Sequence, residues 1–155
     1  MRKRSSYRPK PIRADAVNWV LAGMKPMKDV PATTTLRLRN HLALESLLKG
    51  TGTRADVDLI IGALNMTEVL ALWGKGDDYR DEISAAQDAL FAMAVRGAKS
   101  GRFLFTGPEM TAVKLGMEIH DAQLDVSLVS DIEKATDYVF HAIANKKAKV
   151  IREYS

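Results

Sequence analysis

The sequence contains no cysteine. That absence excludes disulfides, iron–sulfur clusters, thiolate zinc sites and cysteine nucleophiles, and it fits a reducing compartment. Long apolar runs are also missing, since no stretch approaches the ~20 residues that a membrane span needs. The basic N-terminus is not followed by the apolar region of a signal peptide, because Asp15 and Asn18 interrupt it. We therefore expect a cytoplasmic protein with no membrane partner.

Two motifs of nucleotide and acyl-transfer chemistry are missing as well. The Gly-Thr-Gly-Thr run at residues 50–53 lacks the preceding strand and the lysine of a phosphate-binding loop. No Gly-x-Ser-x-Gly nucleophile elbow is present. The sequence predicts a protein that is not an enzyme and that has no catalytic residues and no cofactor.

Aromatic residues are few, at 6% of the chain, whereas Ala, Leu and Met are plentiful. This balance favours helices over strands. The 155 residues fit one domain, and a domain of this size buries roughly 68–70% of its unfolded surface. We predict an all-α fold: a single-domain bundle of five or six helices with an extended basic N-terminal arm.

Apolar spacing, caps and glycines predict where the helices begin and end. The predicted helices span residues 15–22, 34–49, 53–74 and 76–101, followed by a long helical region from residue 106; residues 24–33 form a loop and residues 102–105 are extended. Thr53, followed by Asp56 in the first turn, is typical of a helix cap. Thr106 and Glu109 match a capping box. Ser130 and Glu133 match a second one, which predicts a break near Ser130, with one bent helix as the alternative. The inward stripe beyond this break is Ile132, Ala135, Val139 and Ile143.

Charge is segregated along the chain. The first thirteen residues carry six basic side chains and no acid, and the last ten carry four basic side chains and one acid. Residues 14–145 are left with a net charge of −5. The predicted organisation is therefore a basic arm at 1–13, a helical bundle at 14–145 and a basic C-terminal tail at 146–155.

Basic ends of this kind favour nucleic acid as the partner. Clustered cations neutralise phosphates and release counterions, and a tyrosine can stack on an unpaired base. We predict non-specific binding of DNA or RNA through both ends, while a protein partner, self-association or a solvated tail without a specific role stays open. The predicted contacts are Arg2, Lys3, Arg4, Tyr7, Arg8, Lys10, Arg13, Lys146, Lys147 and Lys149.

Residues 42–64 form a helix, a glycine-containing turn and another helix, a pattern that also occurs in helix-turn-helix DNA-binding proteins. The charges argue against that function here. Asp56 and Asp58 would face phosphate with only Arg54 to compensate. We favour ordinary antiparallel packing of the two helices.

Glu118, Asp121 and Asp125 are three and four residues apart and so share one helix face, beside His120. Such a cluster can bind a divalent metal, and a metal-dependent enzyme that uses this face is a third, less favoured alternative for the function. However, the helical-bundle metal motif needs Glu and His three residues apart, and Glu118 and His120 are two apart. We favour a polar face paired with Lys114 or with an Arg of another helix, and we place His120 in the core as a hydrogen-bonded histidine.

Four further polar residues lie near apolar stripes of the second and third helices: Asn40, His41, Asn65 and Glu68. Such groups often form hydrogen bonds between helices. We predict that role for them, with membership of a binding site as the alternative.

Three strings of residues carry a family resemblance. They are Arg-Lys-Arg-Ser-Ser-Tyr-Arg-Pro-Lys-Pro at 2–11, Asn-Met-Thr-Glu at 65–68 and His-Asp-Ala-Gln-Leu-Asp at 120–125. Together they resemble a family of small uncharacterised proteins of tailed bacteriophages and prophages of proteobacteria. The resemblance carries over no functional residue. It implies a phage accessory factor for nucleic acid, or alternatively a protein-binding inhibitor of a host complex, such as an anti-CRISPR or host-takeover protein.

Overall fold

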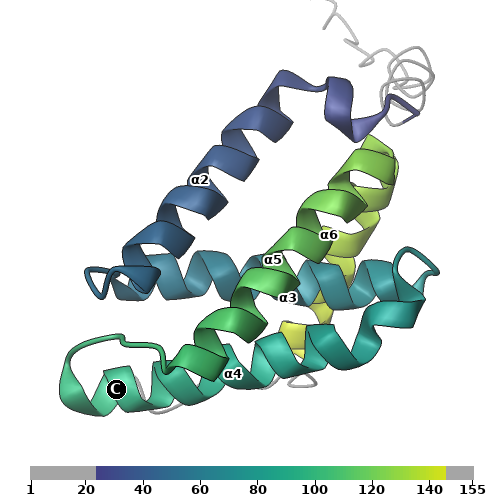
Figure 1. Ribbon diagram of the computed structural model, residues 1–155. Helices are drawn as coiled ribbons and strands as arrows, with labels where there is room; N and C mark the ends of the chain where they lie inside the picture. Colours follow the sequence, from purple (N-terminus) through teal and green to yellow (C-terminus); the bar gives the residue numbers. More distant parts are fainter. Residues whose placement is uncertain (1–23, 146–155) are drawn as a thin grey trace, which may run out of the picture.

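The computed structural model describes residues 24–145, which form a bundle of five α-helices (Figure 1). The helices are α2 (Pro31–Leu48), α3 (Arg54–Leu72), α4 (Arg80–Ser100), α5 (Gly107–Val126) and α6 (Val129–Ala144), and short 3₁₀ turns, η1 (Met27–Asp29) and η2 (Asp77–Tyr79), precede α2 and α4. The all-α bundle expected from the sequence is confirmed. The basic arm, the helix expected at 15–22 and the C-terminal tail lie outside the described residues.

Two helices begin at the capping residues that the sequence indicates. At the start of α3, the backbone N–H of Thr53 donates to the carboxylate of Asp56 at 2.8 Å, and the Thr53 hydroxyl accepts the Asp56 N–H. At the start of α5, Thr106 and Glu109 exchange the same pair of bonds. Each box satisfies two backbone donors that would otherwise lack a helical partner.

Helix α2 begins earlier than the sequence predicts. The expected loop ran to Thr33, but the structure places Pro31 in the first turn of α2. Proline is tolerated there because its missing N–H would have had no partner within the helix. Thr33 is buried, and its hydroxyl donates to the carbonyl of Met27 at 2.6 Å, which fastens η1 to this first turn.

The expected break near Ser130 is confirmed, since α5 ends at Val126 and α6 begins at Val129, but the expected capping box is not formed. Ser130 lies inside α6, so it does not cap this helix. The carboxylate of Asp131 instead accepts the backbone N–H of Leu128 at 2.8 Å. At the end of α5, the hydroxyl of Ser127 donates to the carbonyl of Gln123 at 2.6 Å. The turn therefore lies at residues 127–128.

Residues 25–27, which we call the strap, pair with this turn. The N–H of Met27 donates to the carbonyl of Ser127 at 2.8 Å, and the N–H of Val129 donates to the carbonyl of Lys25 at 3.0 Å. The two bonds form an isolated antiparallel bridge. Because the partners are far apart in the sequence, local patterns give no signal of this bridge.

Helix α3 is central and contacts α2, α4, α5 and α6 (Figure 1). Its apolar stripe meets those of α4 and α5 in one core. Fully buried side chains include Ile60, Leu64 and Leu70 of α3, Ile83, Leu90 and Met93 of α4, and Val113, Met117 and Leu124 of α5. Where α5 approaches α4 and α3, a Cβ added to Gly116 would lie 2.5 Å from the Cβ of Ala86. These helices therefore pack closely at that glycine.

Residues 102–105 link α4 to α5 without helical structure. The ring of Phe103 packs over Gly97 in the last turns of α4, so this glycine lies inside the helix and contributes a packing site. Within residues 24–145, none of the helices has the length and apolar character needed to cross a bilayer.

Candidate functional site

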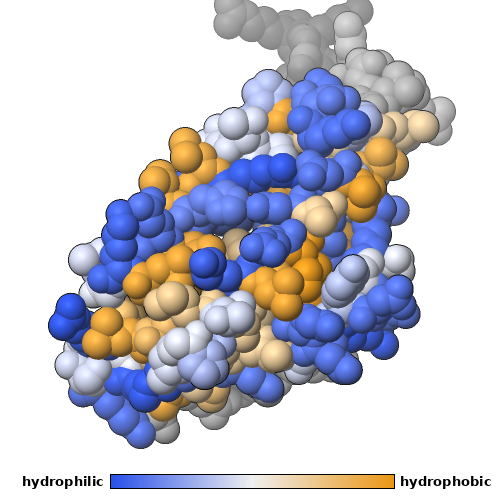
Figure 2. All heavy atoms as spheres, viewed as in Figure 1, coloured by the Kyte–Doolittle hydropathy of each residue, from blue (hydrophilic) through white to orange (hydrophobic). Residues whose placement is uncertain are grey.

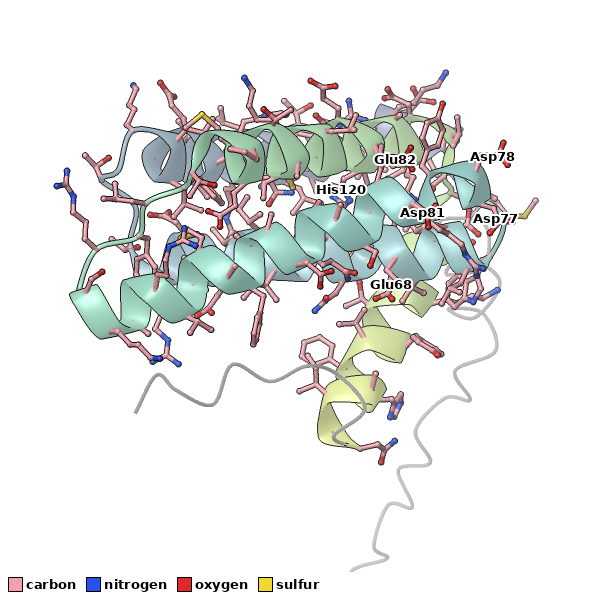
Figure 3. The ribbon with its side chains drawn as sticks, turned by 60° about the horizontal axis from the view of Figure 1, so that its bottom comes forward. Glu68, Asp77, Asp78, Asp81, Glu82 and His120 are labelled. Atoms are coloured by element: carbon pink, nitrogen blue, oxygen red, sulfur yellow. The ribbon has the colours of Figure 1, made fainter. Side chains whose placement is uncertain are left out.

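A groove of about 400 Å³ lies between α3, α4 and α6. Helix α6 packs along α3 through Ile132 and Ala135 but has little contact with α4, and its last turns project from the rest of the bundle (Figure 3). The walls are mostly apolar, with Ile61, Leu64, Val69 and Leu72 from α3, Leu90 and Phe91 from α4, and Tyr138, Val139 and Ala142 from α6.

Polar side chains gather on one side of the groove. The Nε2 of Gln87 on α4 donates to Glu68 Oε2 at 3.0 Å and to Asn65 Oδ1 at 3.3 Å, both on α3. The predicted interhelical role of Asn65 and Glu68 is thus confirmed, and both residues also line the groove. Figure 3 shows Glu68 beside α6 and below α4. The charged lining residues are Glu68 and Asp88, both carboxylates.

Tyr138, which lines the groove, also makes an aromatic contact. The rings of Trp73 and Tyr138 meet edge to face, with centroids 6.0 Å apart. Both side chains remain about half exposed, so this contact leaves apolar surface open to other groups.

The last turns of α6 are less buried than the sequence predicts. Ile132 and Ala135 are buried and Val139 is half-buried, but Ile143 is 46% exposed. Its prediction as an inward residue is therefore wrong, because the contact of α6 with the core ends near Val139. The sequence did not predict the groove; its signal is an apolar stripe on α6 that is longer than the buried part of this helix.

The carboxylates of α5 are paired with α2. His41 Nε2 lies 2.7 Å from Asp121 Oδ2, and Arg37 lies 2.5 Å from Asp125 Oδ1. Arg37 also donates to the backbone carbonyl of Asp121 at 3.1 Å. The predicted pairing with an arginine of another helix is confirmed, and so is the interhelical bond of His41. On this face, Figure 2 shows hydrophilic side chains with smaller apolar areas between them.

His120 points away from these carboxylates and lies in the core, as predicted. It is 1% exposed, and its Nδ1 is 3.0 Å from the hydroxyl of Thr67. Burial lowers the pKa of His120 to about 4, an effect that the charge of Asp121 partly opposes and those of Arg37 and His41 add to. The imidazole is therefore neutral at pH 7.

The four metal candidates do not converge on one point. Glu118 is exposed, His120 is turned into the core, and Asp121 and Asp125 are bonded to different cations of α2. Among residues 24–145, no group of three or more metal-ligating side chains is arranged to hold an ion. The arrangement serves instead to join α2 to α5.

No family model, curated protein or solved structure matches the chain. The likeness to phage proteins therefore stays a prediction.

Two other expectations can be compared with the structure. Asn40 is buried, but its Nδ2 has no hydrogen-bond partner within the described part of the chain; the bond expected for this amide is thus not formed there. In the possible helix-turn-helix segment, α2 and α3 pack together through Leu44, Leu47 and Val57, and the carboxylate of Asp56 is engaged in the cap of α3. This is the ordinary helix packing that the sequence favours.

The ten predicted nucleic-acid contacts, seven in residues 1–13 and three in residues 146–149, lie outside the described residues. Residues 24–145 contain 13 lysines and arginines and 17 aspartates and glutamates, a net charge of −4. Several of these cations lie within 4 Å of a carboxylate, among them Arg37, Lys49, Lys75, Arg80 and Arg96.

Proposed function

We propose that the protein is a phage-type accessory protein that binds nucleic acid without sequence specificity through its basic ends. The charge distribution carries this proposal. The bundle is acidic and engages many of its own cations, whereas residues 1–13 and 146–155 carry most of the excess positive charge. Phosphate binding depends on such clustered cations and weakens as the salt concentration rises, because releasing counterions into a more concentrated solution gains less entropy.

The test is a gel-shift titration of the full chain with duplex and single-stranded DNA and with RNA at several salt concentrations. Deleting residues 1–13 should weaken binding and flatten the dependence of log K on log salt by ~0.9 per lost duplex phosphate contact. The control replaces two exposed lysines of the bundle, Lys114→Ala with Lys134→Ala. An unchanged affinity and salt slope after the deletion would refute the proposal.

A second candidate function is a protein-binding inhibitor of a host complex that uses the acidic bundle as a mimic of nucleic acid. The observation that favours it lies at the start of α4, where Asp77, Asp78 and Asp81 are exposed within a few residues of one another (Figure 3). Closely spaced carboxylates can present charge in the manner of a phosphate backbone.

This candidate is tested by affinity purification from nuclease-treated host lysate. A stoichiometric partner should be retained by the full chain and lost on Asp78→Lys with Asp81→Lys. The control, Glu133→Lys with Asp137→Lys, makes the same charge change on α6. Loss in both variants, or retention in both, would show that the acidic end of α4 is not the binding surface.

A further inference from the structure

The groove between α3, α4 and α6 keeps large apolar side chains in contact with solvent. Leu72, Phe91 and Tyr138 line it and remain 49%, 37% and 51% exposed. Within residues 24–145 these side chains are therefore not covered. Apolar surface gathered in one hollow commonly marks a binding site.

We propose that the C-terminal tail of the same chain, residues 146–155, binds back into this groove. The first reason is position. Helix α6 lines the groove with Tyr138, Val139 and Ala142 and ends at Ala144. The tail therefore begins four residues after Ala142, the last residue of α6 that lines the groove.

The length of the tail is also sufficient. Ten residues follow Asn145, and an extended chain of that length reaches ~33 Å. The α4 wall from Ser84 to Phe91 spans only ~10 Å at the rise of an α-helix. The tail can turn back and still cover this wall.

The apolar and charged residues of the tail are complementary to those that line the groove. Its sequence, Lys-Lys-Ala-Lys-Val-Ile-Arg-Glu-Tyr-Ser, places the apolar pair Val150 and Ile151 between basic residues. The apolar pair suits the aliphatic and aromatic walls of the groove. The tail has a net charge of +3, and the charged residues of the groove, Glu68 and Asp88, are both acidic.

The basic arm is a poorer candidate for the same groove. Its chain joins the bundle through the strap, which pairs with residues 127–129 at the start of α6. Tyr138 lies about ten residues further along, which corresponds to ~15 Å of helix. Along the chain, the tail is therefore attached closer to Tyr138 than the arm is.

Binding of the tail has a consequence for its lysines. Lys146, Lys147 and Lys149 would lie near the groove carboxylates, which would then compete with phosphate for them. The contact itself lies within one chain, so it does not rest on the proposed nucleic-acid function and is tested without nucleic acid.

Because the chain has no cysteine, Ser155→Cys introduces a single attachment point for a nitroxide spin label. We would record the amide NMR spectrum of the full-length labelled chain before and after reduction of the label. The expected result is that the amide signals of Gln87 and Phe91 lose most of their intensity while the label is oxidised. Signals of Leu38 on α2 and Leu115 on α5, which do not line the groove, should keep theirs.

Variants of the tail provide the matched controls, and they leave the bundle unchanged. Val150→Asp with Ile151→Asp should restore the groove signals, whereas Val150→Ile with Ile151→Val, which keeps both side chains apolar, should leave them weak. Equal loss over all helices, no loss in the groove, or loss unaffected by the aspartates would overturn the proposal. A further control mixes ¹⁵N chains that carry no spin label with spin-labelled ¹⁴N chains. Weakening of the groove signals in this mixture would also overturn the proposal, since it would mean that a second copy supplies the tail.

Discussion

The hydroxyl of Thr67 on α3 and the imidazole of His120 on α5 are hydrogen-bonded in the core, with 3.0 Å between Oγ1 and Nδ1. The same hydroxyl donates its proton to the carbonyl of Ala63 at 2.8 Å. A hydroxyl has one proton to donate, so Oγ1 must accept from Nδ1–H. The neutral His120 therefore carries its proton on Nδ1.

This histidine should make the stability of the fold depend on pH. Its pKa is about 4 in the folded chain and about 6.5 when unfolded. Between these values the unfolded state binds the proton and the folded state does not, so the free energy of unfolding falls as pH decreases from 6.5 towards 4. At about 1.4 kcal/mol per pH unit the loss reaches about 3 kcal/mol.

Urea titrations between pH 7 and 4 would measure this effect. His120→Gln should lower the free energy of unfolding at pH 7. Its free energy of unfolding should also depend less on pH, by an amount that corresponds to about one proton. The exposed His141 provides the control, since His141→Gln should keep the slope of the unchanged protein. Equal slopes in all three proteins would contradict the prediction.

Replacing glycine by alanine should change the stability of the protein in opposite directions at Gly116 and Gly62. Gly116→Ala would place a Cβ 2.5 Å from Ala86 Cβ and 2.9 Å from a methyl group of Leu64, and such overpacking costs about 1–3 kcal/mol. Gly62→Ala meets no atom within 4 Å and should stabilise α3 by about 0.5–1 kcal/mol, because alanine loses less backbone entropy. Thermal unfolding of the two variants checks both signs; stabilisation by Gly116→Ala would show that α4 and α5 can move apart freely.

Glu109 should contribute more stability than its neighbour Glu118 on the same helix. Both oxygens of Glu109 accept bonds from Arg96, at 2.7 and 2.6 Å, and one of them also accepts the N–H of Thr106. The hydrogen bond with Arg96 is the main reason why the pKa of Glu109 is lowered. Glu109→Ala should cost about 1–2 kcal/mol through loss of the cap and the ion pair.

Glu118→Ala is the matched substitution at an exposed position of α5 and should change stability by less than about 0.5 kcal/mol. Denaturant unfolding at pH 7 compares the two variants. Equal costs would indicate that the capping box contributes nothing beyond the charge.

Replacing Gln123 should cost more stability than replacing Gln87. Its Nε2 donates to the carbonyls of Thr67 and Lys75 at 2.9 and 2.8 Å, and the side chain is buried. Gln123→Leu should therefore cost about 1–3 kcal/mol, because a buried acceptor loses its partner. Gln87→Leu, which breaks bonds at the half-buried groove, should cost less than about 1 kcal/mol; chemical denaturation that ranks the two variants in the reverse order would refute this assignment.

The sequence predicted those features of the fold that depend on neighbouring residues. Thr53 with Asp56 and Thr106 with Glu109 form caps because three residues suffice to bring both partners together. The capping box expected at Ser130 and Glu133 is not formed, because Leu128 and Asp131 cap α6 instead. The strap, about 100 positions earlier in the chain, pairs with the turn before this cap. Such a contact leaves no local signal.

Among the candidate sites, too, only the features that depend on local sequence were predicted. The core position of His120 followed from helical spacing alone. The groove did not, because it depends on where α6 ends relative to α3 and α4, and Ile143 has the same sequence pattern as the buried Ile132. Helical periodicity identifies an apolar stripe but does not determine whether another element covers it.

The bridge between the strap and the α5–α6 turn also constrains the order of folding. Closing a loop of ~100 residues is entropically costly, and such distant contacts form late. As the chain is synthesised from its N-terminus, the strap emerges before every helix of the bundle, yet its partner emerges only after α5 is complete. The first described segment to be made is thus among the last to find its native position.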